Sequence, residues 1–334
     1  MSHFVRLTRW LRRLGYFFLV ALAVTPALLG QTCSSGTDLD AATRSALDTA
    51  AKQFLDMSKN GDVAGLKANA IPAITGDFGS IEQAVVTNRP YLADGQATIT
   101  GTYLLDASDA KATLARAEFF CGIYNSANRL AFFIPNLPPG RYGIVIQKVN
   151  GKDPITLTLV LQNLGGWKLA GYYPRLDAVG GHDGDWYLSK AREFKAKGQL
   201  HNAWFYYLTA WDLTAPVNFM STPELDKISD EMQGVRPSDM PSDSAPLSLS
   251  AGGKTFKVTE LTAVPVDNNL DLRVRYQDAN AANSAVAFQD NMAVIKAIVA
   301  KYPELRDGFT AVIARAVDSS GTEYGSVLPM KDVK

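Results

Sequence analysis

The chain has 334 residues, of which 47% are hydrophobic and 20% are charged, and these values exclude a disordered chain, a collagen-like repeat and a coiled-coil rod. The 33 Lys and Arg residues balance 33 Asp and Glu residues, so the charge gives no indication of nucleic-acid binding. The two cysteines are too few for a disulfide-rich scaffold or for a cysteine-based zinc or iron–sulfur site. At about 100–200 residues per domain, the length predicts two or three domains.

Residues 1–30 have the pattern of an export signal. Residues 1–13 contain four arginines and no acidic residue, and residues 14–30 contain no charged residue. A basic start followed by an apolar stretch is typical of a secretory signal. The apolar stretch also approaches the length that spans a bilayer, so a cleaved signal peptide and a retained membrane anchor both stay open. Either one predicts an exported protein, periplasmic or anchored to the cell membrane and facing outward.

The two cysteines are expected to have separate roles. Lipoprotein signals end in Leu-x-Gly/Ala-Cys, but Thr32 stands immediately before Cys33 in place of a small residue, so we expect no lipid on Cys33. Cys33 follows the apolar stretch in a Ser/Gly/Thr-rich segment, whereas Cys121 alternates with core residues of a predicted strand. A bond between them would require the segment to reach an interior strand. We therefore predict no essential disulfide between Cys33 and Cys121.

The first predicted domain covers residues 38–176 and begins with helices. Apolar residues recur at three- and four-residue spacing over 38–60, which predicts a helix that stops at Asn60-Gly61. A short helix is expected at 62–66, and another at 79–88 that ends before Pro90. These helices precede all the predicted strands of this domain.

From residue 96 to residue 173 the apolar period changes to two, which predicts strands. Short connectors rich in Asn, Gly and Pro join them, which favours antiparallel neighbours. Helices followed by hairpins predict an α+β fold with helices on one face of a curved antiparallel sheet. The six predicted strands cover residues 96–105, 113–124, 129–134, 141–149, 155–161 and 167–173.

Two stretches of this domain suggest a family. Residues 137–142 have the sequence Leu-Pro-Pro-Gly-Arg-Tyr and enter a strand, and residues 166–173 have the sequence Gly-Trp-Lys-Leu-Ala-Gly-Tyr-Tyr and form the closing strand. Together with the element order, they make residues 38–176 resemble the nuclear transport factor 2-like superfamily of cone-shaped α+β domains. The resemblance implies a curved sheet that encloses a cavity. It does not select a function, because the superfamily contains enzymes, binding modules and assembly factors.

Residues 183–233 are predicted to form a helical hairpin. Small and aromatic residues recur there at the spacing of a single tetratricopeptide repeat, with Gly198 at the tight turn and Ala203 at the close contact between helices. One repeat cannot bury its own apolar face, and about three are needed for an independent array. We therefore expect the hairpin to pack on the preceding domain or to offer a surface to a larger partner.

Residues 234–248 are rich in Pro and Ser and contain no aromatic residue, which predicts a linker. Beyond it, two strands, one amphipathic helix and a further hairpin are expected over residues 249–334. This order predicts a small two-layer β-β-α-β-β domain that is connected flexibly to the rest of the chain.

The histidines provide one candidate site. Gly181 to Asp185 contains His182, Asp183 and Asp185 just before a predicted helix, and His201 could complete a metal-ligand set. The alternative, which we favour, is that an aspartate caps the helix and the glycines form the turn into it. No recognised metal motif is present, so we expect no metal and no cofactor.

The predicted strand 113–124 provides the second candidate site. Ala117, Phe119 and Cys121 alternate with the polar side chains of Arg116 and Glu118. A cavity in the cone-like domain could use Glu118 as a base, with Arg129 or Tyr142 holding an anion and Tyr124 nearby. The alternative is a solvated face on which Glu118 pairs with an arginine.

These observations favour a non-catalytic, exported protein that binds a protein partner in the cell envelope and no nucleic acid. The alternative is a small-molecule-binding protein or an enzyme that uses the cavity of the cone-like domain. The first hypothesis rests on the export pattern, the helical hairpin and the linker at 234–248, and on the lack of a recognised catalytic motif. The second rests on the resemblance.

Overall fold

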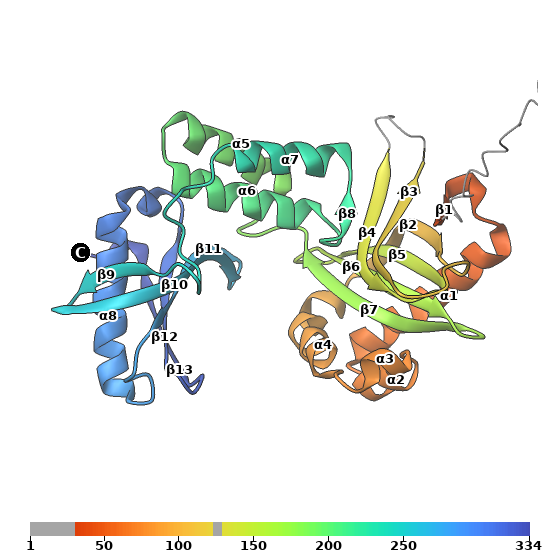
Figure 1. Cartoon of the computed structure of the whole chain (residues 1–334), viewed down its shortest axis with the longest axis horizontal. Helices are drawn as coiled ribbons and strands as arrows, with labels where there is room; N and C mark the ends of the chain where they lie inside the picture. Colours follow the sequence, from red (N-terminus) through yellow and green to blue (C-terminus); the bar gives the residue numbers. More distant parts are fainter. Residues whose placement is uncertain (1–30, 123–128) are drawn as a thin grey trace, which may run out of the picture. The chain divides into compact units, whose positions relative to one another are not determined.

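The computed structural model describes residues 31–122 and 129–334, which form one compact unit from Gln31 onward. The predicted signal or anchor at 1–30 and the candidate residue Tyr124 lie outside the described residues. In the described part the chain forms eight α-helices and three sheets, which confirms the α+β class (Figure 1). Among these helices none is both long and apolar enough to cross a membrane.

The first five-stranded sheet, in the order β1-β2-β5-β6-β7, is antiparallel throughout. Its strands are β1 (Thr32–Ser35), β2 (Gln96–Asp106), β5 (Arg141–Asn150), β6 (Ile155–Asn163) and β7 (Trp167–Leu176). The preceding helices are η1 (Gly36–Asp38), α1 (Ala41–Asn60), α2 (Val63–Ala68), α3 (Pro72–Thr75) and α4 (Gly79–Leu92). A separate three-stranded sheet consists of β3 (Leu114–Cys121), β4 (Leu130–Leu137) and β8 (Met220–Ser221).

The sequence explains the limits of α1. The Asp40 side chain accepts a hydrogen bond from the Thr43 amide at 2.8 Å, so the helix begins at Ala41, three residues after the predicted start. Gly61 adopts φ 69° and ends it, as predicted. Helix α4 differs from the prediction because it continues through Pro90 to Leu92. Pro90 removes a single hydrogen bond near the C-terminus, and the complete burial of Leu92 offsets that loss.

The first sheet is covered on both faces (Figure 1). Helices α1 and α4 pack on one face, where Leu47, Phe54 and Val85 join Val145 and Leu157 of the sheet in one core. The β3–β4 hairpin covers the other face in a second core. The predicted alternation of β3 is confirmed from Arg116 onward, since Ala117, Phe119 and Cys121 are buried and the residues between them are exposed. Ala115, which continues this alternation toward the start of the strand, is exposed.

The remaining helices and the second five-stranded sheet share one core. The helices are α5 (Gly184–Ala196), α6 (Leu200–Thr214), α7 (Pro223–Gln233) and α8 (Ser284–Lys301), with short helices η2 (Pro303–Asp307) and η3 (Met330–Asp332). The strands, in spatial order, are β13 (Glu323–Pro329), β12 (Ala311–Val317), β11 (Asn269–Gln277), β10 (Lys254–Val266) and β9 (Leu247–Ala251). Helix α8 connects the parallel neighbours β11 and β12. Strand β9 is an addition to the expected β-β-α-β-β order.

Residues 234–248 do not separate two cores, in contrast to the predicted linker. Val235 is only 3% exposed and belongs to the same core as Tyr206 of α6 and Phe309 of the last region, with Met240 packed against it. The Tyr206 hydroxyl donates a hydrogen bond to the Gly308 carbonyl at 2.8 Å. The composition indicated a linker because it is rich in Pro and Ser, but the apolar residues within it are held by tertiary contacts. The helical hairpin and the C-terminal sheet are therefore one packed body.

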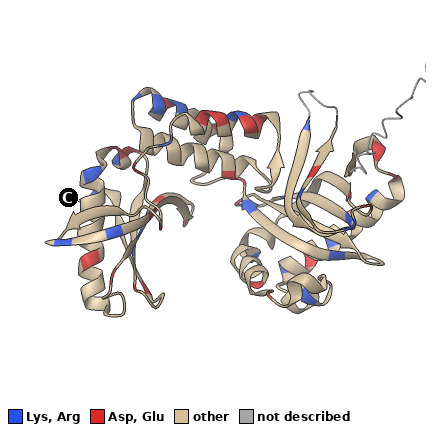
Figure 2. Cartoon of the chain, viewed as in Figure 1, with Lys and Arg blue, Asp and Glu red and all other residues tan. Residues whose placement is uncertain are grey.

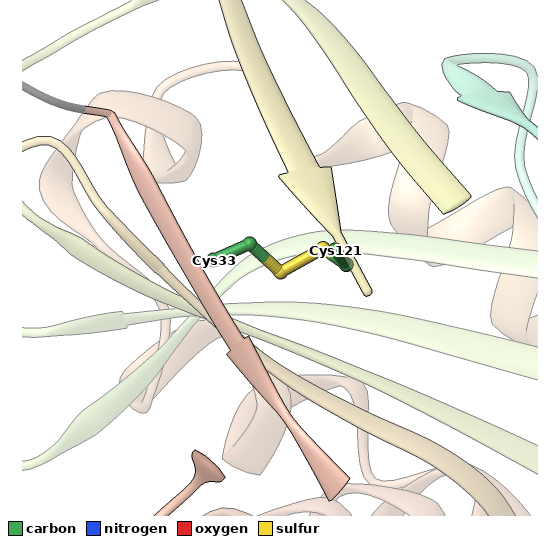
Figure 3. The surroundings of a disulfide bond; sticks show 2 residues. All are labelled: Cys33 and Cys121. Carbon is green, nitrogen blue, oxygen red and sulfur yellow. A yellow bond between two sulfur atoms is a disulfide. The ribbon is translucent and has the colours of Figure 1, made fainter. Parts of the chain in front are cut away.

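The disulfide prediction is wrong, because Cys33 and Cys121 are bonded to each other (Figure 3). Part of the Ser/Gly/Thr-rich segment around Cys33 is strand β1, which pairs with β2 so that Cys33 lies opposite Leu105. This pairing brings Cys33 beside the end of β3, with a Cα–Cα distance of 5.1 Å to Cys121. A sulfur atom in this bond cannot carry a thioether lipid, so the bridge and lipidation of Cys33 exclude each other.

Charged side chains fix α7 to its neighbours, and Figure 2 shows both signs along α5 and α7. The Arg192 guanidinium donates two hydrogen bonds of 2.7 Å to the Glu231 carboxylate, and the Tyr207 hydroxyl donates a third at 3.0 Å. The hydrogen bonds from Arg192 lower the pKa of Glu231, and those from Tyr207 add to this effect. Burial opposes the shift but does not reverse it.

We predict that Glu231→Gln lowers the free energy of unfolding by about 1–2 kcal/mol at pH 7, because charge-assisted hydrogen bonds are lost. A lowered folded-state pKa gives stability that is present above the unfolded value of about 4.3 and is lost as the pH falls through the folded value. The difference between the variant and the wild type should therefore shrink below about pH 4. Urea titrations between about pH 3 and 7 measure it. Glu224→Gln, at an exposed position of the same helix, is the control. A difference that is constant with pH would contradict this assignment.

Candidate functional site

A groove with a volume of about 940 Å³ lies on the side of the first sheet that β3, β4 and β8 cover. One wall is formed by residues 133–138, at the end of β4 and just beyond it, and by residues 218–220. The floor comes from the sheet, through Tyr142 of β5, Val160 of β6 and Tyr173 of β7. Residues 71–73, at the start of α3, close the far side.

The groove exists because β8 is short. Strand β8 pairs only with Ala131 and Phe132, and the Phe133 amide donates to the Phe219 carbonyl at 2.8 Å. Beyond Phe133 this edge of β4 carries no strand partner among the described residues. Pro135 has no N–H group, so it leaves no donor unpaired there and discourages the addition of another strand. The free space beside β4 is therefore lined by side chains rather than filled by a further strand.

Neutral polar groups lie at one part of the groove. The Gln162 amide donates to the Tyr142 hydroxyl at 3.1 Å, and that hydroxyl donates to the Pro138 carbonyl at 2.9 Å. Gly140, at φ 149°, makes the turn before β5, and a Cβ atom there would come within 3.0 Å of the Gln162 amide nitrogen. Burial raises the pKa of Tyr142 and of Tyr173, so both hydroxyls are protonated at neutral pH.

The described residues that line the groove are uncharged. They include no Asp, Glu, His, Lys or Arg, and no Ser, Thr or Cys. Most are aliphatic, aromatic or proline residues, and the polar ones are two asparagines, one glutamine and two tyrosines. This set offers hydrogen bonds and apolar contact area to a bound molecule, but it offers neither a carboxylate or imidazole base nor an activated nucleophile.

The structure places one of the predicted pocket residues, Tyr142, in the groove. Glu118 is on the exposed face of β3 and forms an ion pair with Arg116 at 3.0 Å. Arg129 forms an ion pair with Asp226 of α7 at 2.6 Å. Neither Glu118 nor Arg129 is among the residues that line the groove. Glu118 lies on the exposed face of β3, and Arg129 precedes β4. The surroundings of Glu118 are those of the alternative, a solvated face on which it pairs with an arginine.

The histidine cluster is divided between separate partners. The His182 ring stacks on Trp186 at 3.8 Å, and Asp183 caps α5 by accepting the Trp186 amide at 3.0 Å. Asp185 lies in the first turn of α5. His201 lies between Glu304 and Asp239, at 2.9 and 3.0 Å. The described residues contain no group of three or more His, Cys, Asp and Glu residues arranged to hold a metal ion.

Sequence reasoning did not find the wall formed by residues 218–220. These residues follow α6, about 80 residues after β4, and reach the first sheet through tertiary contacts. The signal that could have found them is the apolar pattern of Val217, Phe219 and Met220 in a connection between two helices. No family model, curated protein or solved structure matches this chain. The geometry of the groove is therefore the basis for its function.

Proposed function

We propose that the protein is an exported binding protein that holds an uncharged, mainly apolar small molecule in the groove. The observation that carries this proposal is the lining, which is apolar and contains no charged side chain among the described residues. Ligand sites typically measure about 300–1,000 Å³ and combine apolar walls with a few polar groups. The groove has both the volume and the mixture of apolar and polar groups that are typical of such sites.

The polar part of the groove gives the ligand an orientation. The Gln162 side-chain amide donates its hydrogen bond to the Tyr142 hydroxyl, and that hydroxyl donates to the Pro138 carbonyl. The side-chain oxygen of Gln162 has no protein donor among the described residues. This oxygen can therefore accept a hydrogen bond from a ligand. We therefore expect a ligand with a hydroxyl or amide donor at one end and an apolar body. Removal of the apolar body from water provides most of the binding free energy, at about 25 cal/mol per Å².

The test is titration with a neutral fluorescent probe, N-phenyl-1-naphthylamine, whose emission rises in apolar surroundings. Ala170→Phe, which adds a ring to the groove lining, should weaken binding by at least about tenfold, since filling the pocket removes the contact area of the probe. Ala300→Phe adds the same ring at an exposed position of α8 and should bind as the wild type does. Melting temperatures show that both variants are folded. Equal affinities of the two variants, or no binding by the wild type, would refute the proposal.

The export of the protein is part of the proposal. The basic and apolar pattern of residues 1–30 supports it, and the Cys33–Cys121 bridge is compatible with it, because disulfides persist in oxidising compartments. Mass spectrometry of the N-terminal peptide from fractionated cells tests the location and separates the cleaved signal from the retained anchor.

A protein partner in the cell envelope is the second candidate, and it now has less support. The helical hairpin is expected either to pack on the preceding domain or to offer a surface to a partner. It buries Tyr187, Phe205 and Tyr207 in the core that it shares with the C-terminal sheet. The segment 234–248, which was expected to let two binding surfaces move independently, is packed into the same core. Affinity capture with the full chain remains the direct test of this candidate.

We also propose the finer fold assignments. Helices on one face of an antiparallel sheet and the closing strand β7 agree with the nuclear transport factor 2-like resemblance of residues 38–176. Gly198, at φ 75° between α5 and α6, agrees with the tetratricopeptide-like hairpin. Side chains fill the space between the helices and the sheet, so the groove on the opposite face is the cavity to which the functional proposal refers. An experimental structure compared with members of both families tests these assignments.

A further inference from the structure

The outer face of the β3–β4 hairpin carries an exposed aromatic patch, which we define as Arg116, Phe120 and Phe133. Phe120 is 57% exposed and contacts Phe133 edge to face, with 6.2 Å between ring centroids. The Arg116 guanidinium lies 4.8 Å from the Phe133 ring centroid, while its ion pair with Glu118 compensates its charge. The patch is therefore aromatic and close to neutral, and it would be stabilised by contact with an apolar partner.

The patch is continuous with the groove. Phe133 belongs to both, because it contacts Phe120 and also lines the groove. Leu164, at the turn between β6 and β7, lines the groove too and is 52% exposed. Exposed apolar side chains therefore lead from the surface of the hairpin into the groove, and they extend to the β6–β7 turn.

The first described residues, which follow the apolar stretch in the sequence, lie beside this patch. The uncharged stretch 14–30 ends one residue before Gln31. The Gln31 side chain accepts a hydrogen bond from the Glu118 amide, and Cys33 is bonded to Cys121. These two attachments lie on β3 on either side of Phe120. Gln31, the first described residue after the apolar stretch, is therefore held beside the patch.

We propose that the patch docks on a lipid bilayer and that the groove takes its ligand, a neutral lipid with a hydroxyl or amide donor, from that bilayer. This inference rests on the proposed function of the groove. Phe120 and Phe133 enter the interface between headgroups and acyl chains, where aromatic side chains are favoured. A neutral lipid then passes over Phe133 into the groove, and its donor meets the carbonyl of Gln162. Because Arg116 is paired, apolar contact rather than charge drives the docking.

The experiment uses the compact chain that begins at Gln31, so that the stretch 14–30 cannot itself bind lipid. Flotation with phosphatidylcholine vesicles measures docking. Phe120→Ser should weaken vesicle binding by about tenfold, since the apolar contact of one phenylalanine is lost. Phe288→Ser is the matched control, because Phe288 of α8 is 49% exposed, similar to Phe120, and belongs to neither the patch nor the groove lining. Raising the salt from about 0.05 to 0.5 M, or adding anionic phosphatidylglycerol, should not change the binding of the wild type.

Transfer of a fluorescent diacylglycerol between vesicles tests the link to the groove. The wild type should accelerate transfer, Phe120→Ser should slow it, and Ala170→Phe should abolish it while vesicle binding persists. No vesicle binding by the wild type, or equal losses for Phe120→Ser and Phe288→Ser, would overturn the docking proposal and favour a protein partner for the patch. If the docking proposal fails while the naphthylamine probe still binds, the proposed function of the groove is retained without membrane docking. If vesicles bind but neither the probe nor the lipid enters, both proposals for the groove are refuted.

Discussion

Replacement of Cys33 and Cys121 together by serine is expected to lower the free energy of unfolding by about 4 kcal/mol. The bridge joins residues 88 apart in the sequence, and closing a loop of this length removes much of the conformational entropy of the unfolded chain. The pairing of β1 with β2 has no other covalent support, so the N-terminal strand should also exchange its amide hydrogens faster. Chemical denaturation followed by tryptophan fluorescence gives the stability, and hydrogen exchange gives the behaviour of β1.

The oxidised wild type treated with a reductant is the matched control for this pair of substitutions. The reduced wild type and the double serine variant should unfold at similar denaturant concentrations, below that of the oxidised protein. A double variant as stable as the oxidised protein would show that the bridge adds nothing to the fold.

Substitution of Val235 by aspartate is expected to cost about 4 kcal/mol or more, enough to unfold the C-terminal part of the chain. Val235 is 3% exposed in the core that the helical hairpin shares with the C-terminal sheet, and a carboxylate there would be buried among apolar side chains. Ala245→Asp lies ten residues later in the same Pro/Ser-rich segment, at an exposed turn, and should leave stability within about 0.5 kcal/mol of the wild type.

This comparison decides between a linker and a packed segment. If residues 234–248 were a flexible linker, the two aspartates would have equal and small effects. Thermal unfolding followed by circular dichroism distinguishes these outcomes, and the amount of soluble protein gives a second measure. Equal melting temperatures for the two variants would restore the linker interpretation and would separate the C-terminal sheet from the helical hairpin.

Local patterns predicted the parts of the fold that depend on neighbours in the sequence. The helix predicted at 38–60 follows from its apolar spacing and from Gly61 at its end, whereas its start at Ala41 is set by the Asp40 cap, which the spacing did not indicate. The faces of β3 follow from the alternation around Phe119. Strand β1 could not be predicted in the same way, because Thr-Cys-Ser-Ser has no apolar alternation and becomes a strand only by pairing with β2, some 70 residues later.

Local sequence patterns also predicted only part of the candidate site. Tyr142, expected from its chemistry to hold an anion, lines the groove, but its hydroxyl donates to the Pro138 carbonyl. Glu118 and Arg129 were selected for their chemistry, but the pleat of β3 and the position of Arg129 at the beginning of β4 direct them elsewhere. The part of the wall formed by Phe219 and Met220 comes from a connection between helices. No local pattern could indicate that this connection reaches a sheet formed much earlier in the chain.

The connection between α6 and α7 makes the groove and the C-terminal core thermodynamically dependent on each other. Val217 belongs to the core beneath the hairpin, the Pro216 carbonyl accepts a hydrogen bond from Thr158 at 3.3 Å, and β8 pairs with β4. The helices on either side of this connection belong to the other core. Any molecule that rests on Phe219 and Met220 therefore favours the conformation in which both helices are docked. By mass action, occupancy at a hundred times the dissociation constant would add about 2.7 kcal/mol to the stability of that conformation.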